Sequence, residues 1–167
     1  MFDFALRVAT PEDEDSVNEL LQASYPDLMS TSYDAAVLAD ALPLFTKANP
    51  SLLSGGTYYL AESGKHGVVG CGGWTRERPG TGEIVPGLGH IRHSGTHASW
   101  TGRGVGRSIY AMCEDDAQSA GVKRFECYSS LNGQGFYASL GFDSVRKINV
   151  NLSSDVSVPG VLMAISI

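Results

Sequence analysis

A glycine-rich run at residues 101–106 is the part of this sequence whose residue types most directly suggest chemistry. It reads Thr-Gly-Arg-Gly-Val-Gly, and it stands between a stretch typical of a β-strand and an amphipathic helix. Backbone amides approach a phosphate closely only where side chains are absent, and the first turn of a helix has N–H groups without intrahelical partners. The run therefore predicts a site that holds a pyrophosphate with main-chain donors.

Two other nucleotide-binding patterns fit the run less well. The dinucleotide pattern G-x-G-x-x-G matches Gly104 and Gly106 but needs a third glycine where Ile109 stands. Glu126 does fit the acidic residue that this pattern places after the next strand. A P-loop ends in Gly-Lys-Ser or Gly-Lys-Thr, and neither occurs. A nicotinamide-dependent oxidoreductase stays as a less favoured alternative, and ATP or GTP hydrolysis is not expected.

Composition and charge narrow the class of protein and its partners. The 167 residues, of which 43% are hydrophobic, suffice for one well-buried core, so we expect a single domain over residues 1–167. The 18 acidic and 12 basic residues give a net charge of −6, which disfavours nucleic acid as a partner. Residues 1–7 lack the basic and apolar segments of a secretory leader, and no window approaches a membrane span. We therefore expect a cytoplasmic protein without a membrane partner.

The three cysteines point to packing rather than to covalent or metal chemistry. Cys71, Cys113 and Cys127 show no C-x-x-C spacing, and each lies in an apolar context. We therefore expect buried free thiols, and we expect no disulfide, zinc site or other metal site. Cys127 would suggest an acyl-enzyme intermediate, but no base stands near it in the sequence, so packing is the preferred interpretation.

The elements around the glycine run predict how it is positioned. Residues 90–96 are typical of a strand, residues 104–121 of an amphipathic helix that ends at Gly121, and residues 123–128 of another strand. This strand–helix–strand order predicts a parallel crossover pair, whose carboxyl ends usually hold ligands.

The other patterns predict further helices and strands on either side of this unit. A capping threonine and a proline at residues 10–13 begin a helix that runs to about residue 24, and a second helical period covers residues 34–47. An exposed, irregular connection is expected over residues 76–89, and loops of this kind often border binding sites. Strands are expected at residues 4–9, 57–62, 68–74, 142–151 and 161–167, a hairpin turn at 63–67 and a short helix at 136–140.

Two further motifs accompany the glycine run. The chain carries His-Ile-Arg-His-Ser-Gly-Thr-His at residues 90–97, Trp-Thr-Gly-Arg-Gly-Val-Gly at residues 100–106 and Phe-Tyr-Ala-Ser-Leu-Gly-Phe at residues 136–142. In this order they resemble the GNAT superfamily of N-acetyltransferases. In that family [RQ]-x-x-G-x-[GA] begins the helix that binds the pyrophosphate of acetyl-CoA, and F-Y-x-x-L-G-F lies beside the thioester. The motifs of the resemblance cover residues 88–142.

The resemblance implies a fold and a reaction. The implied fold is α/β (α+β), with a mixed, mostly antiparallel central sheet flanked by helices. The implied reaction moves the acetyl group of acetyl-CoA, the co-substrate, to a primary amine of a small molecule or a protein by direct attack. A non-catalytic acyl-CoA-binding sensor or interaction module is the alternative from another class, and a homodimer through the carboxyl-terminal strands is also considered.

The resemblance also implies the residues that bind acetyl-CoA. A splay of the strand near Gly95 and Thr96 would let a backbone amide polarise the thioester carbonyl. Thr101 stands where the family usually has Arg or Gln, which should weaken the cradle without abolishing it, because backbone N–H groups make most phosphate contacts. Asn132 would touch the pantetheine arm or cap the following helix. The implied set is Gly95, Thr96, His97, Thr101, Gly102, Arg103, Gly104, Val105, Gly106, Arg107, Ser108 and Asn132.

Attack by an amine on a thioester needs a proton acceptor, a polarised carbonyl and a proton donor for the leaving thiolate. The resemblance implies Tyr137 as the donor, although its ring would also pack well on the sheet. His90 stands at the strand position where several relatives carry a glutamate or histidine base, and imidazole titrates near neutral pH. Glu83 is a second choice of base that would act through a water molecule.

Arg92 is the predicted substrate-binding residue. It lies two residues after His90 and therefore on the same face of an unbulged strand, whereas His93 points to the opposite face. Arg92 could bind a substrate carboxylate or form an internal ion pair. For His93 and His97 a local hydrogen bond is the preferred interpretation.

Overall fold

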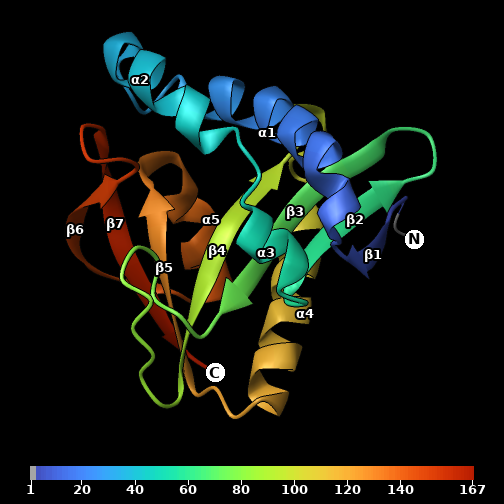
Figure 1. Cartoon of the computed structure of the whole chain (residues 1–167), viewed down its shortest axis with the longest axis vertical. Helices are drawn as coiled ribbons and strands as arrows, with labels where there is room; N and C mark the ends of the chain where they lie inside the picture. Colours follow the sequence, from blue (N-terminus) through green and yellow to red (C-terminus); the bar gives the residue numbers. More distant parts are fainter. Residues whose placement is uncertain (1–2) are drawn as a thin grey trace.

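The computed structural model describes residues 3–167; Met1 and Phe2, which begin the amino-terminal stretch discussed above, lie outside the described residues. Within the described part, a 7-stranded mixed sheet has the order β1-β2-β3-β4-β5-β7-β6 (Figure 1). Neighbouring strands are antiparallel except β4 and β5, which are parallel. This confirms the predicted mixed and mostly antiparallel sheet. The strands are β1 (Ala5–Val8), β2 (Tyr58–Ser63), β3 (Gly67–Thr75), β4 (Leu88–Thr96), β5 (Arg124–Ser130), β6 (Asp143–Asn151) and β7 (Ser157–Ser166).

Helices flank both faces of the sheet. They are α1 (Glu14–Met29), α2 (Ala35–Phe45), α3 (Pro50–Ser54), α4 (Val105–Ser119) and α5 (Gln134–Leu140). In Figure 1, α1 and α3 lie in front of the sheet and α4 lies behind it. A Cβ atom added at Gly95 would lie 3.1 Å from Leu21 of α1, and one added at Gly72 would lie 3.1 Å from Ile109 of α4. Alternate positions on the central strands therefore face different helices.

The predicted crossover pair is formed by β4, α4 and β5. The two strands pair only at three positions, which end with His90 opposite Glu126. Beyond that pair β4 and β5 separate, as the two arrows in Figure 1 show. The separation leaves the upper ends of two parallel strands apart, with the start of α4 at one side.

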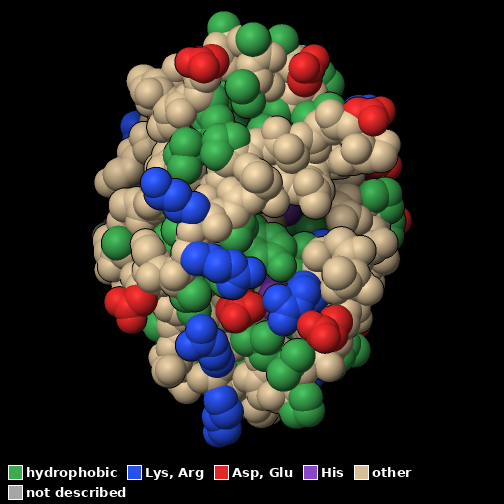
Figure 2. All heavy atoms as spheres, turned by 90° about the vertical axis from the view of Figure 1, so that its left-hand side faces the viewer, with side chains coloured by type: hydrophobic (Ala, Val, Ile, Leu, Met, Phe, Trp, Pro, Cys, Tyr) green, Lys and Arg blue, Asp and Glu red, His purple; other side chains and the backbone are tan. Residues whose placement is uncertain are grey.

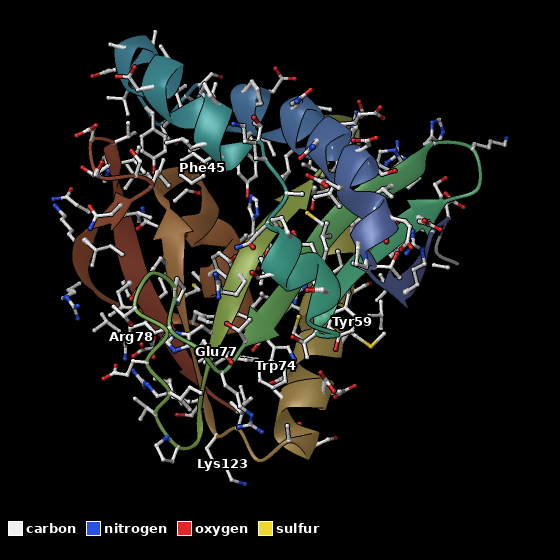
Figure 3. All side chains as sticks on the ribbon, in the orientation of Figure 1. Phe45, Tyr59, Trp74, Glu77, Arg78 and Lys123 are labelled. Carbon is white, nitrogen blue, oxygen red and sulfur yellow. The ribbon has the colours of Figure 1, made fainter. Side chains whose placement is uncertain are left out.

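Helix α4 packs closely because β3 has glycines beneath it. A Cβ atom at Gly70 would overlap Val105 Cγ1 and lie 3.2 Å from Ile109 Cδ1. On the far end of the helix, Asp116 Oδ2 accepts hydrogen bonds from Tyr59 Oη at 2.7 Å and from Trp74 Nε1 at 2.9 Å. Figure 3 shows these two aromatic side chains at the lower ends of β2 and β3, beside α4. The helix is therefore held at both ends.

Helix α1 extends beyond its predicted end. It begins after a capping box at the predicted capping threonine, in which the Thr10 amide donates to the Asp13 carboxylate at 2.7 Å. It ends at Met29 and contains Pro26. The added turn buries Met29 to 2% exposure and brings Tyr25 to β4. Contacts in the tertiary structure thus outweigh the cost of an internal proline.

Two buried clusters cover the two faces of the sheet. The cluster on the α4 side includes Trp74, Ile91 and Phe125, and the cluster on the α1 side includes Leu21 and Leu60. Among residues 3–167 no helix combines the length and the apolar character needed to cross a membrane.

Candidate active site

A cavity of about 750 Å³ lies where β4 and β5 separate. Its wall combines Tyr25 of α1, Phe45 of α2, Ser94 of β4, Gly104 before α4 and Tyr137 of α5. Figure 3 labels Phe45, which lies above the gap between the two strands. The cavity therefore joins elements from both faces of the sheet at the place where the parallel strands diverge.

The glycine run forms one end of the cavity. Gly102 has φ +75° and Gly104, the N-cap of α4, has φ +83°, a left-handed conformation that favours glycine. Nothing lies within 4 Å of a Cβ atom added at Gly102, so the backbone conformation and open space, not crowding, distinguish this position. Both glycines line the cavity together with Thr101, Gly106 and Arg107. The unpaired first-turn amides of α4 thus lie at the cavity wall, and this arrangement fits a pyrophosphate.

Three other predicted contact residues have local partners. Thr101 Oγ1 donates to the carbonyl of Ala98 at 3.2 Å, and the amide of Ser108 donates to the Gly104 carbonyl at 3.0 Å within the start of the helix. His97 Nδ1 accepts a hydrogen bond at 3.0 Å from the amide two residues later, which is the expected local bond. Thr101 lines the main cavity, whereas Ser108 and His97 are not among its lining residues.

Two arginines lie beside the glycine run. The guanidinium of Arg103 stacks over Trp100 at 4.6 Å from the ring centroid. Arg107 Nη2 lies 3.3 Å from the hydroxyl of Ser139 on α5 and lines the cavity. Both arginines are exposed, so each can supply positive charge near the cradle.

Tyr137 lies on α5 at the opposite side of the cavity from α1. Its ring packs edge-on against Phe136 and Phe142, with centroids 5.2 Å and 5.3 Å apart. Burial raises the pKa of Tyr137, and the nearby Ser94 side chain partly opposes that rise. The phenol therefore keeps its proton at neutral pH and can act as a donor. Sequence reasoning missed Ser94, whose role depends on a contact between β4 and α5.

A bulge in β4 places Ser94 in the cavity. Arg92 is opposite Gly73 and Gly95 is opposite Cys71, so His93 and Ser94 together face a single residue of β3. His93 has φ +43°, the only positive φ of a non-glycine residue among residues 3–167. The resemblance implied a splay near Gly95 and Thr96; both line the cavity, and the bulge itself comes just before them.

The hydroxyls of two tyrosines, the buried Tyr58 and the partly buried Tyr25, hold the carbonyls of the bulge. Tyr58 Oη donates to the His93 carbonyl at 2.6 Å, and Tyr25 Oη donates to the Ser94 carbonyl at 2.8 Å. The Nε2 atom of His93 lies 2.9 Å from the carbonyl oxygen of Phe45 at the end of α2. Burial lowers the pKa of His93, which is therefore neutral at pH 7 and donates this bond. No signal in the sequence pairs these residues, because they come from α1, α2, β2 and β4.

His90 lies on β4 before the bulge and does not line the cavity. Its side chain is 1% exposed, and its Nε2 atom has no hydrogen-bond partner among residues 3–167. Burial and the nearby Arg78 lower the pKa of His90. The imidazole is therefore neutral and has an unused nitrogen.

Arg92 is half-buried and lies outside the cavity lining. Its Nη1 atom donates to Thr75 Oγ1 at 2.9 Å. No bulge separates Arg92 from His90, so the predicted common face holds for these two residues. Ile91 between them packs in the cluster on the α4 side, which places His90 and Arg92 on the opposite side of the sheet.

The segment 76–87 lies over that side of β4 and β5. Arg78 contacts Glu83 at 3.0 Å and Glu126 at 3.5 Å, and Arg124 contacts Glu126 at 3.9 Å. Figure 3 shows Glu77 and Arg78 on this segment in front of the lower sheet. Glu83, the second choice of base, is exposed in an ion pair and outside the cavity lining.

Asn132 and the cysteines complete the set of predicted residues. Asn132 lines the cavity, and the N-cap of α5 is Gly133 without a side-chain bond, so Asn132 does not cap that helix. The three cysteines are free and buried, as expected. Burial raises the pKa of Cys71 to about 11 and that of Cys127 to about 12, so neither is a thiolate at neutral pH.

The structure is similar to several solved acetyltransferases. A GCN5-related N-acetyltransferase from Rhodopseudomonas palustris has a TM-score of 0.74 at 22% identity, covering 100% of this chain and 98% of that one. PaiA N-acetyltransferase from Thermoplasma acidophilum, solved with coenzyme A, has a TM-score of 0.71 at 13% identity over 98% and 99%. YncA from Salmonella typhimurium, solved with acetyl-CoA, has a TM-score of 0.62 at 16% identity, covering 98% of this chain and 93% of that one. At these identities the likenesses show the fold.

Sequence comparison gives the family. No curated protein matches the chain. The sequence model of the acetyltransferase (GNAT) family does match, over residues 15–142, a range that contains the glycine run, the bulge and Tyr137. Because this match spans most of the chain, the protein belongs to the acetyltransferase (GNAT) family.

Proposed function

We propose that this chain is a single-domain N-acetyltransferase that moves the acetyl group of acetyl-CoA to a primary amine by direct attack. The observation that carries the proposal is one cavity that runs from the glycine run at the start of α4 to Tyr137 beside the β4 bulge. Acetyl-CoA supplies an acetyl group activated as a thioester. The chain supplies binding, orientation and proton transfer.

Main-chain N–H groups around Gly102, Gly104 and Gly106 are the proposed pyrophosphate donors. The Thr101 side chain is bonded to Ala98, so the added positive charge would come from the exposed arginines beside the run. Gly95, Thr96 and Asn132 line the cavity towards Tyr137, and the pantetheine arm is proposed to pass along them.

Tyr137 is the proposed general acid, and His90 the proposed base. The protonated phenol can give its proton to the leaving thiolate, while the neutral imidazole of His90 has a nitrogen available to accept one. An acyl-enzyme intermediate is not proposed, because burial keeps the thiol of Cys127 protonated. The acceptor amine is proposed to approach from the face that carries His90 and Arg92.

The experiment is an acetyl-transfer screen over a library of primary amines, read by release of free thiol from acetyl-CoA. We expect amine-dependent release for at least one class of amine, and binding of CoA by calorimetry. Tight binding of CoA without release from any amine would contradict the enzyme and favour the non-catalytic acyl-CoA-binding module. Stabilisation by NADH but not by acetyl-CoA in a thermal-shift assay would favour an oxidoreductase.

A further inference from the structure

Arg92 is a half-buried cation that makes no ion pair among residues 3–167. Its guanidinium donates to the Thr75 hydroxyl at 2.9 Å. Arg78 and Arg124 differ, because both contact the carboxylate of Glu126. Burial lowers the pKa of Arg92, and the carboxylate of Glu77, which makes no ion pair with it, only partly opposes that shift. Since a buried charge is costly unless it is paired, this guanidinium is ready for an anion from outside the chain.

The same face of the sheet also holds two hydrogen-bond acceptors that lack a partner among residues 3–167. His90 Nε2 and Glu126 Oε1 are buried and have no hydrogen-bond partner among residues 3–167, although Glu126 lies 3.5 Å from Arg78. His90 and Glu126 are opposite each other in the last pair of β4 and β5. Arg92 is two residues further along β4, which corresponds to about 7 Å of strand. Groups for an amine and for an anion therefore lie close together on one face.

The arginines around this face are balanced by neighbouring glutamates, whereas the whole chain is acidic. The net charge of −6 would repel an anionic substrate in the absence of a local cation. Figure 2 shows a hollow with histidine visible inside it, and Lys and Arg side chains gather along its lower border among a few acidic ones. The planar fork of an arginine matches a carboxylate better than the point charge of a lysine does.

We propose that the acceptor carries a carboxylate close to its primary amine, as an amino acid does, and that Arg92 binds this carboxylate. The inference rests on the proposed function and deepens it by naming the substrate class. The hydroxyl of Thr75 orients the guanidinium, and the short spacing from Arg92 to His90 and Glu126 requires the amino and carboxylate groups to lie within a few bonds of each other. The amino terminus of a protein has no such adjacent carboxylate, and it is the competing acceptor.

The test compares each of a panel of free amino acids with its own carboxamide, at equal concentrations of the unprotonated amine. Thiol release from acetyl-CoA gives kcat/KM for both members of each pair. For the preferred side chain we expect kcat/KM to be roughly 10- to 100-fold higher for the free amino acid than for its carboxamide, the range of a charge-assisted pair. Arg92→Gln should remove this preference by lowering kcat/KM for the free amino acid alone. Arg92→Lys should keep part of it.

Arg124→Gln is the matched control, because Arg124 lies on the neighbouring strand but contacts Glu126. It should keep the preference for the carboxylate, and thermal unfolding would verify that each variant is folded. Equal rates for acids and amides in the wild-type protein, or a preference that survives Arg92→Gln, would overturn the inference and leave the transferase intact. Peptides with free amino termini as the sole acceptors would also overturn it. Release from no amine at all would overturn the proposed function as well.

Discussion

Ser94 and Tyr137 form a pair that the bulge of β4 creates. Ser94 stands at the bulge and Tyr137 on α5, and both side chains line the cavity, where Ser94 lowers the pKa of the phenol. Burial raises the pKa of the phenol and weakens it as an acid, whereas the Ser94 hydroxyl stabilises the phenolate and restores part of its acidity. The proposed proton donor thus depends on a neighbour that offsets part of the effect of burial on its pKa.

This pairing predicts non-additive effects on turnover. Tyr137→Phe should lower kcat by roughly 100-fold or more, as loss of general acid catalysis does, with the affinity for CoA nearly unchanged. Ser94→Ala should lower kcat less, and should have no further effect in the Tyr137→Phe background. The four rates form a double-mutant cycle. Equal effects of Ser94→Ala in both backgrounds would show that Ser94 acts independently of Tyr137.

At the scale of elements, helix α4 and strand β4 each contribute a local departure from regular structure. The turn before α4 has two glycines at positive φ, and β4 has a bulge at His93. The bulge is held by hydroxyls of Tyr58 and Tyr25 and by the carbonyl at the end of α2. The two irregular segments meet at the cavity because β4 and β5 separate there.

The glycine turn predicts a loss of CoA binding that can be separated from a loss of stability. Gly102 and Gly121 both have positive φ, +75° and +87°, and nothing lies within 4 Å of an added Cβ atom at either position. Alanine at each should lower the free energy of unfolding by about 1–2 kcal/mol. Only Gly102→Ala should weaken CoA binding, by about 10-fold or more, because Gly121 lies at the far end of α4.

Calorimetric titration with CoA and urea unfolding of both variants would measure the two effects. The matched pair removes strain as an explanation, because both substitutions place a side chain at a similar backbone angle. Equal CoA affinity for Gly102→Ala, Gly121→Ala and the wild-type chain would contradict the assignment of the cradle.

At the scale of the whole molecule, buried titratable groups couple stability to pH. Burial lowers the pKa values of His90 and His93 below that of an unfolded histidine, near 6.5. Below about pH 6.5 the unfolded chain therefore binds protons that the folded chain does not, and stability falls as the pH falls. Asp13 acts in a lower window, because hydrogen bonds from Arg7 hold its pKa at about 2 against an ordinary 3.8.

The predicted profile has its first loss of stability as the pH falls below about 6.5, measured as the free energy of unfolding in urea. His93→Asn should flatten this part of the profile, because asparagine tolerates the positive φ of His93 and does not titrate there. His66→Asn, at an exposed position, is the control and should leave the slope unchanged. A steep slope that persists in His93→Asn would assign the effect to other groups. The contribution of Asp13 should be lost only as the pH falls from 3.8 towards 2.

Much of the fold could be predicted from local patterns. The strand–helix–strand unit, the hairpin of β2 and β3, and the short helix α5 all follow from hydrophobic periodicity and from glycines at turns. The glycine run and the Phe-Tyr-Ala-Ser-Leu-Gly-Phe segment also indicated the two ends of the cavity, because a few consecutive residues form each end. The sequence by itself thus determined the family resemblance, the class of fold and the position of the glycine run before α4.

The tertiary structure decided what depends on residues far apart in the chain. Helix α1 continues past Pro26 because Tyr25 and Met29 find partners in the core, and the bulge at His93 exists only against the register of β3. The exclusion of His90 from the cavity lining and the unpaired state of Arg92 likewise follow from neighbouring strands and from the segment 76–87. Local spacing gives the direction of a side chain, but burial, register and counter-charges come from segments that meet only after folding.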